Sequence, residues 1–229
     1  MHTPSSAVNI RELRGRTKMA IVDTDWNTFL SPDSELPPDV CFLVTGEDER
    51  SSKTIRAHSQ LLGGVSPVFR KQFFGPMKDE REVIEVEMTS AEAFQKLIDF
   101  IYKPAGEDTF TMDKISRPQK HFEVLELAER YEILDLKTPV KKALEAFVVT
   151  KGNFQLSATV AMNNKEEFED CSVILSLRCL KFLQDTAKNP YDMIEDTKNR
   201  FPGVSQDILL ELKRVKDEKM PGNINHYLH

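Results

Sequence analysis

The stretch from Asp39 to Gly75, DVCFLVTGEDERSSKTIRAHSQLLGGVSPVFRKQFFG, decides the fold of this chain. Residues 40–44 are apolar without interruption, which predicts a strand buried on both faces. Residues 54–58 return as a second strand after a polar connection, so we expect a hairpin. Ser59 is the expected N-cap of a short helix. Ser66-Pro67 then begins another helix, with Ser at the N-cap and Pro at the first helical position.

A third strand follows the two short helices. Residues 83–88 alternate from Ile84 onward, so Ile84, Val86 and Met88 are expected on the buried side of a half-buried strand. An amphipathic helix comes next, and further helices follow it. The order of strand, strand, helix, helix, strand and helix predicts an α+β fold.

The rest of the chain is predicted to be largely helical. Thr89 and Glu92 have the spacing of a capping box before the amphipathic helix, which is expected to end at Pro104. Residues 104–120 contain two prolines and a glycine and predict a long surface loop. From His121 onward, apolar residues at helical spacing mark helices around residues 122–131, 136–147, 156–162, 173–183 and 208–215, the last capped by Ser205.

Composition limits the class of protein. The 31 Lys and Arg residues against 37 Asp and Glu residues give a formal net charge of −6, which disfavours nucleic acid as a partner. No apolar run approaches the roughly 20 residues that a membrane-spanning helix needs. The N-terminus also lacks an apolar stretch of signal-peptide length. We therefore expect no membrane association and a location in the cytoplasm, the nucleus or both.

The sequence contains no recognisable catalytic, cofactor or metal site. The three cysteines, Cys41, Cys171 and Cys179, lack the spacing of a zinc or redox site, and the last two are expected in the core. Gly63-Gly64 lies within a predicted helix, so it is not a nucleotide-binding loop. A Cys-His hydrolase built from Cys41 and His58 is disfavoured because Cys41 belongs to a buried strand. We predict a protein that is not an enzyme and uses no cofactor.

Several ordered motifs in the first half resemble those of a BTB/POZ domain. They are Asp39-Val40, Ala57-His58-Ser59, Ser66-Pro67-Val68-Phe69, Phe73-Phe74 and Phe100-Ile101-Tyr102. Such a series is more specific than any single motif. Residues 153–216 resemble a BACK-type helical extension, and Trp26 and Phe74-Gly75 are similar to BTB-BACK proteins that carry a PHR domain. The resemblance divides the chain into an N-terminal arm (1–35), a BTB/POZ domain (36–150), a BACK-like extension (151–216) and a disordered tail (217–229).

The resemblance implies a homodimeric protein-interaction module. BTB domains commonly form homodimers through their first helix pair and an N-terminal segment. In this chain that implies an interface containing Leu61, Leu62 and Val65, with Ile21 contributed by the arm. Residues 19–22 form a short apolar patch that is compatible with an edge strand, and the arm swapping this strand between protomers is an open alternative.

Many BTB domains also dock onto cullin-3 as adaptors of a ubiquitin ligase. Their docking motif is a hydrophobic residue, any residue and Glu, which corresponds here to Met77-Lys78-Asp79, with Tyr102 nearby. Gly75-Pro76 is expected to form a turn that presents Met77 outward. Asp79 departs from the motif, since its carboxylate lies one methylene closer to the backbone than that of Glu.

Two polar residues and two further functions complete the expectations. Asp39 and His58 are typical of the family, and we expect them to hydrogen-bond each other or the backbone. One alternative function is a BTB homodimer that recruits transcriptional co-repressors. It is favoured by the basic residues of the arm and disfavoured by net acidity and missing zinc fingers. The other is a homotypic scaffold, or a competitor that dimerises with longer BTB proteins. The expected partners are therefore a second copy, the N-terminal region of cullin-3 and other BTB proteins.

Overall fold

The computed structural model describes residues 37–45, 52–102, 112, 117–186 and 193–219. These residues belong to two compact units, one comprising residues 1–110 with 123–136 and the other residues 111–122 with 137–229. The predicted arm, including Ile21, lies outside the described residues, as do most of the loop predicted over 104–120 and residues 220–229 of the predicted tail.

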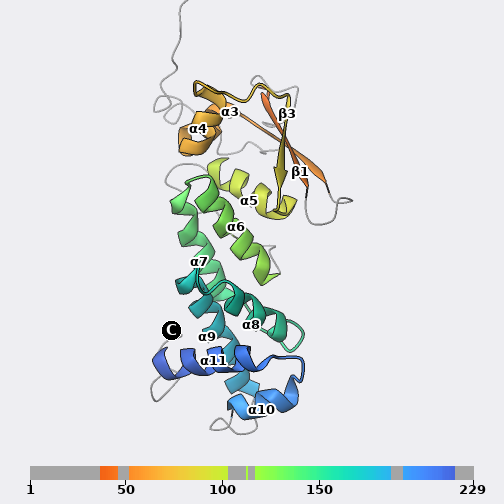
Figure 1. Ribbon diagram of the computed structural model, residues 1–229, viewed down its shortest axis with the longest axis vertical. Helices are drawn as coiled ribbons and strands as arrows, with labels where there is room; N and C mark the ends of the chain where they lie inside the picture. Colours follow the sequence, from red (N-terminus) through yellow and green to blue (C-terminus); the bar gives the residue numbers. More distant parts are fainter. Residues whose placement is uncertain (1–36, 46–51, 103–111, 113–116, 187–192, 220–229) are drawn as a thin grey trace, which may run out of the picture. The chain divides into compact units, whose positions relative to one another are not determined.

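The first unit contains a three-stranded sheet of β1 (Val40–Thr45), β2 (Lys53–Ala57) and β3 (Val83–Glu87) in the order β2-β1-β3 (Figure 1). β1 runs antiparallel to β2, which confirms the predicted hairpin. β3 runs parallel to β1, because β2 brings the chain back to the end of the sheet where β1 begins and the two helices lie between β2 and β3.

Two burial predictions for the sheet were wrong. In β1 only Phe42 and Val44 are buried, while the other four residues of the strand are partly exposed, so one face of the strand is covered rather than both. Ile84 and Val86 are buried in β3 as expected, but Met88 is 83% exposed. The backbone turns at Met88 with a φ of 58°, which ends the strand alternation before this residue.

The helices α3 (Ser59–Val65) and α4 (Pro67–Phe74) follow the hairpin. Ser66 caps α4 as predicted, because its Oγ accepts a hydrogen bond from the Phe69 amide at 3.1 Å. Ser59 is not the N-cap of α3 but its first residue, and the N-cap position belongs to His58. The cap of this helix is supplied from elsewhere: the Asp39 carboxylate accepts from the Ser59 amide at 2.7 Å and from its hydroxyl at 2.6 Å.

The helix α5 (Ala91–Tyr102) begins one residue later than the predicted capping box implies. Ser90 rather than Thr89 caps it, since the Ser90 Oγ accepts from the Ala93 amide at 3.2 Å. The Glu123 carboxylate in turn accepts from both the amide and the hydroxyl of Ser90. Among the residues described, the buried Thr89 hydroxyl has no hydrogen-bond partner.

An aromatic cluster forms the core of the first unit. The Phe42 ring lies 5.0 Å from Phe94 and 5.9 Å from Phe69, measured between ring centroids. Phe69 also stacks on Tyr131 at 4.3 Å. Such contacts add roughly 0.5–1.5 kcal/mol to the burial of each ring pair. Phe42 is therefore the point at which the sheet is joined to α4 and α5.

The helix α6 (Pro118–Arg130) includes the last three residues of the predicted loop and has Pro at its first position. A short 3-10 helix, η2 (Leu134–Leu136), comes between α6 and α7. The buried residues of α6 include Phe122, Leu125 and Ala128, as its helical spacing predicted.

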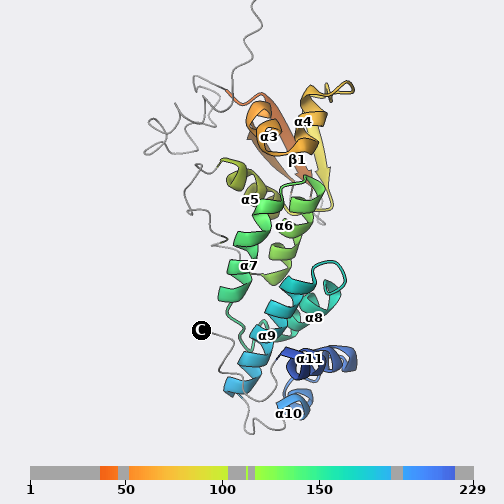
Figure 2. The ribbon, with the colours of Figure 1, turned by 90° about the vertical axis from the view of Figure 1, so that its left-hand side faces the viewer.

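The second unit is helical. It contains α7 (Lys137–Ala146), α8 (Phe154–Asn163), α9 (Glu169–Thr186), α10 (Met193–Arg200) and α11 (Gln206–Lys219) (Figure 2). α10 was not predicted, because its residues are mostly polar. α11 continues to Lys219, so the first three residues of the predicted tail are helical.

Apolar residues from α8, α9 and α11 form one core in this unit. Its fully buried members include Phe154, Cys179, Leu180 and Leu183. Burial raises the pKa of both the Cys171 and Cys179 thiols, which keeps them protonated. This agrees with the prediction that both are core cysteines.

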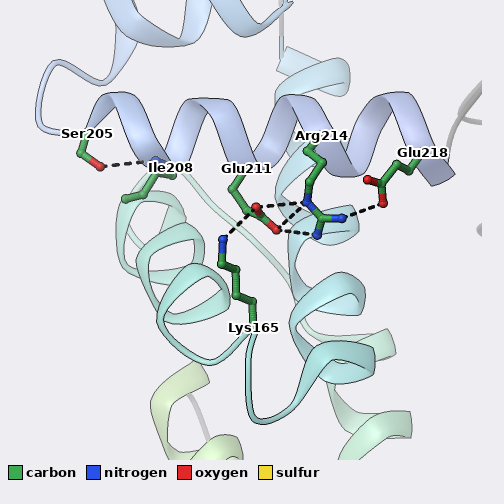
Figure 3. Close-up of polar contacts among 6 residues, drawn as sticks. All are labelled: Lys165, Ser205, Ile208, Glu211, Arg214 and Glu218. Carbon is green, nitrogen blue, oxygen red and sulfur yellow. Dashed lines mark hydrogen bonds and ion pairs between the residues drawn. The ribbon is translucent and has the colours of Figure 1, made fainter.

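A polar network lies on α11 at the edge of this core (Figure 3). The Ser205 Oγ accepts a hydrogen bond from the Ile208 amide at 3.4 Å, which confirms Ser205 as the N-cap of α11. Glu211 accepts hydrogen bonds from the Arg214 guanidinium, the shortest at 2.7 Å, and pairs with Lys165 at 3.3 Å. Arg214 also donates to Glu218 at 2.7 Å. The network fastens α11 to the segment that follows α8.

The described part of the chain contains neither a membrane-spanning helix nor a cluster of metal ligands. No helix there is long and apolar enough to cross a membrane. No group of three or more His, Cys, Asp or Glu side chains there is arranged to hold a metal ion.

Candidate docking surface

The candidate site is the loop that leaves α4 at Gly75. The Gly75 amide donates to the Lys71 carbonyl at 3.0 Å and closes the last turn of the helix. A Cβ atom at this position would lie 2.3 Å from the Lys71 oxygen. The close approach excludes any larger residue, so the direction in which the loop departs depends on glycine.

Two apolar side chains are exposed at this end of α4. Met77 is 94% exposed, which confirms that the turn presents it outward, and Phe74 is 56% exposed. Phe74 lies over α3 at Gly63, where a Cβ atom would come within 2.8 Å of the phenyl ring. Large exposed apolar groups close together in the sequence of a folded domain are candidates for a protein-interaction surface.

The Asp79 carboxylate is bound within its own loop. Arg81 donates from Nε to Oδ1 at 2.9 Å and from Nη2 to Oδ2 at 2.6 Å, and its backbone amide donates to Oδ1 at 3.2 Å. The Asp79 amide donates to the Gln72 carbonyl at 2.7 Å. The hydrogen bonds from Arg81 hold the pKa of Asp79 well below its usual value. Asp79 is therefore ionised and already engaged.

A shallow concavity of about 350 Å³ lies beside the loop. It is lined by Asp39, Val40, Ser59, Phe73, Lys78, Asp79, Glu80, Arg81 and Ile84. Lys78 and Glu80 form an ion pair at 3.2 Å, so the charged residues of the loop are largely paired. The surface offers an apolar protrusion at Met77 and a polar recess next to it.

Tyr102 does not belong to this surface as an exposed group. Its side chain is only 6% exposed, and its hydroxyl accepts from the His58 amide at 2.7 Å. The His58 Nδ1 lies 2.7 Å from the same oxygen. Burial raises the pKa of Tyr102. Tyr102 thus binds His58 at the end of the hairpin and is not exposed for contact with a partner. Asp39 in turn binds Ser59, the first residue of α3.

The residues predicted for a dimer interface fall into three groups. Leu61 and Val65 are half-buried on α3 and remain accessible to a second copy. Leu62 is fully buried within its own domain, so it supports the helix from inside and is not a contact residue. Ile21 lies outside the described residues.

Sequence reasoning missed Arg81 as a member of the site. The only signal is a pair of opposite charges two residues apart after a Gly-Pro turn. Such pairs usually remain solvated, and nothing in their spacing indicates a bidentate contact. Gln72 was missed because its contribution depends on the loop folding back over α4.

The small sheet with its covering helices and the exposed apolar loop are features of a protein-interaction domain. A family model of the BTB/POZ domain matches residues 31–147, and the chain therefore belongs to the BTB/POZ domain family. The predicted fold, a BTB domain with a small sheet followed by further helices, is confirmed. BTB/POZ domains are protein-interaction modules that generally self-associate and are generally not enzymes.

Several curated proteins with BTB or POZ in their names match part of this chain. The chain is 27% identical over 108 residues to BTB and MATH domain-containing protein 42 of Caenorhabditis elegans, which covers 46% of this chain and 25% of the relative. It is 37% identical over 71 residues to BTB/POZ and MATH domain-containing protein 3 of Arabidopsis thaliana, a match that covers 31% of this chain and 16% of the relative. TD and POZ domain-containing protein 1 of Mus musculus is 28% identical over 113 residues, a match that covers 49% of this chain and 28% of the relative.

The match thus spans less than a third of each relative. Among solved structures, the BTB domain of human gigaxonin is similar, with 20% identity and a TM-score of 0.36 over 61% of this chain and 97% of that one.

Proposed function

We propose that this chain is a homodimeric substrate adaptor or scaffold of a cullin-3 RING ubiquitin ligase and acts in the cytoplasm, the nucleus or both. The observation that carries the proposal is Met77, which is 94% exposed at the first position of the docking motif that the family uses. Met77 lies on the loop that leaves α4 at Gly75.

Met77 has the chemistry of an anchor for a partner's apolar groove. Its flexible, polarizable side chain adapts to an irregular pocket. Burying it fully contributes roughly 1.5–3 kcal/mol, which corresponds to about a 10- to 150-fold change in affinity. Phe74 provides a second apolar contact close to the same helix end. The helices α8 to α11, with a core of their own, support a BACK-like role in extending the module.

The proposal is tested by titrating the purified full chain with the N-terminal region of cullin-3, with mass measured by light scattering. We expect two cullins per dimer. Met77→Glu should weaken binding at least tenfold because it places a charge in the groove. Met88→Glu is the matched control, since Met88 is a similarly exposed methionine of the same unit. Undiminished binding by Met77→Glu would show that the docking surface lies elsewhere.

The dimer is tested in the same instrument. Leu61→Glu should yield monomers, because a charge at an isologous interface is buried twice. Met88→Glu again serves as the control. A wild-type chain that is monomeric at micromolar concentration would refute the dimer.

A second candidate function is a homotypic scaffold that does not bind cullin-3. The engagement of Asp79 by Arg81 favours it, since the acidic group of the motif is not free. A stable dimer without cullin binding in the titration would select this candidate.

A further inference from the structure

The acidic residue of the docking motif has an intramolecular partner. Asp79 receives both Arg81 side-chain bonds, at 2.6 and 2.9 Å, one on each carboxylate oxygen. The Arg81 backbone amide occupies Oδ1 as well, and Gln72 Nε2 lies 3.4 Å from Oδ2. A bidentate guanidinium–carboxylate pair satisfies most of the lone pairs with which a carboxylate could bind a partner.

We infer that Arg81 is a latch on the docking loop, occupying the Asp79 carboxylate in the free protein so that a partner must displace it to use that carboxylate. The inference rests on the proposed function, since the partner considered is cullin-3. It assigns to Arg81 a regulatory role: Arg81 sets the affinity of the site without being an anchor.

The position of the pair allows it to open. The Arg81 side chain is 62% exposed, and Asp79 retains 14% of its side-chain exposure. The guanidinium can therefore swing into solvent without disturbing the core. Met77, Asp79 and Arg81 all lie on the segment between α4 and β3, so opening leaves both elements in place.

The size of the effect follows from the exposure of the pair. Exposed ion pairs are weak, and breaking one corresponds to about a two- to fivefold change in an equilibrium constant. The latch should therefore reduce the affinity for cullin-3 by about this factor. It tunes docking rather than abolishing it.

The test uses calorimetric titration of the full chain with the N-terminal region of cullin-3. Arg81→Ala should bind about two- to fivefold more tightly than the wild type. Lys53→Ala is the matched control, because it also removes one exposed positive charge from the same unit but lies on β2, outside the docking loop. Its affinity should stay at the wild-type value.

A double-mutant cycle separates the latch from a general effect on the loop. In the background of Asp79→Asn, which removes the charge that Arg81 holds, Arg81→Ala should no longer change the affinity. The same gain in both backgrounds would overturn the latch, because the effect would not depend on Asp79.

The remaining outcomes are also decisive. Unchanged or weaker binding by Arg81→Ala would overturn the latch, and weaker binding would mean that the ion pair instead preorganises the loop. In that case a loss of binding by Met77→Glu shows that the proposed function still stands. Cullin-3 binding by the Arg81→Ala variant, with no binding by the wild type, would support the latch. If no variant binds, including Arg81→Ala, both the latch and the proposed function fail.

Discussion

Replacement of Ser66 by Ala tests how the first unit is held together. Ser66 is fully buried, and its hydroxyl makes two hydrogen bonds. It accepts from the Phe69 amide at 3.1 Å, capping α4, and donates to the Tyr131 carbonyl at 2.6 Å. The second bond joins residues 65 positions apart.

The expected cost follows from these two bonds. Loss of an N-cap costs about 1 kcal/mol, and a buried carbonyl left without its donor costs about 1–3 kcal/mol. Ser66→Ala should therefore destabilise the unit by about 2–4 kcal/mol. Amides of α4 that exchange through opening of the whole unit should then exchange about 30- to 900-fold faster.

Hydrogen exchange followed by mass spectrometry measures this change, with urea unfolding as a second readout. Ser205→Ala is the matched control, because Ser205 also caps a helix but is exposed and makes only the longer bond of 3.4 Å. It should cost about 0.5–1 kcal/mol in its own unit. The reasoning is refuted if Ser66→Ala costs no more than Ser205→Ala.

Three further changes test other parts of the chain. Burial lowers the pKa of His121 below its usual 6.5. The unfolded chain therefore takes up the proton first as the pH falls, and the free energy of unfolding decreases below about pH 6.5. His121→Gln should remove this pH dependence in urea titrations between pH 7 and 5. Hydrogen bonds from Arg214 hold the pKa of Glu211 below its usual 4.5. The ionised Glu211 therefore stabilises the fold above pH 4.5, and this contribution is lost as the pH falls through the pKa of the folded state. Glu211→Gln should lower the free energy of unfolding by about 1 kcal/mol at pH 7 and leave it unchanged in strong acid. Gly75→Ala should displace the loop from Lys71 and weaken cullin-3 binding while circular dichroism stays unchanged, and full affinity would contradict the role given to glycine.

Local patterns predicted most of the secondary structure correctly. The hairpin, the Ser66-Pro67 helix start and the Ser205 cap all depend on residues within a few positions of one another. Hydrogen bonds of this kind are set by short-range geometry, so residue type and spacing are sufficient evidence. The exposure of Met77 was predictable for the same reason, since a Gly-Pro turn limits where the next side chain points.

Local patterns failed where a distant residue changed the outcome. Ser59 has the residue type of a cap, yet Asp39 from the start of β1 binds its amide and its hydroxyl. Thr89 has capping-box spacing, yet Ser90 caps the helix while bound to Glu123, 33 positions away. In both cases a partner from another part of the chain, and not the local spacing, decides how the start of the helix is bound.

Residue type and spacing therefore predicted the BTB/POZ motifs, the loop that carries Met77 and the order of the described strands and helices, with the exception of η2 and α10. The burial of Leu62 and Tyr102 and the binding of Asp79 by Arg81 became apparent only from the packing of the folded chain. The physical reason is that periodicity and spacing constrain neighbours along the chain. Burial and ion pairing depend on which side chains meet after the elements pack.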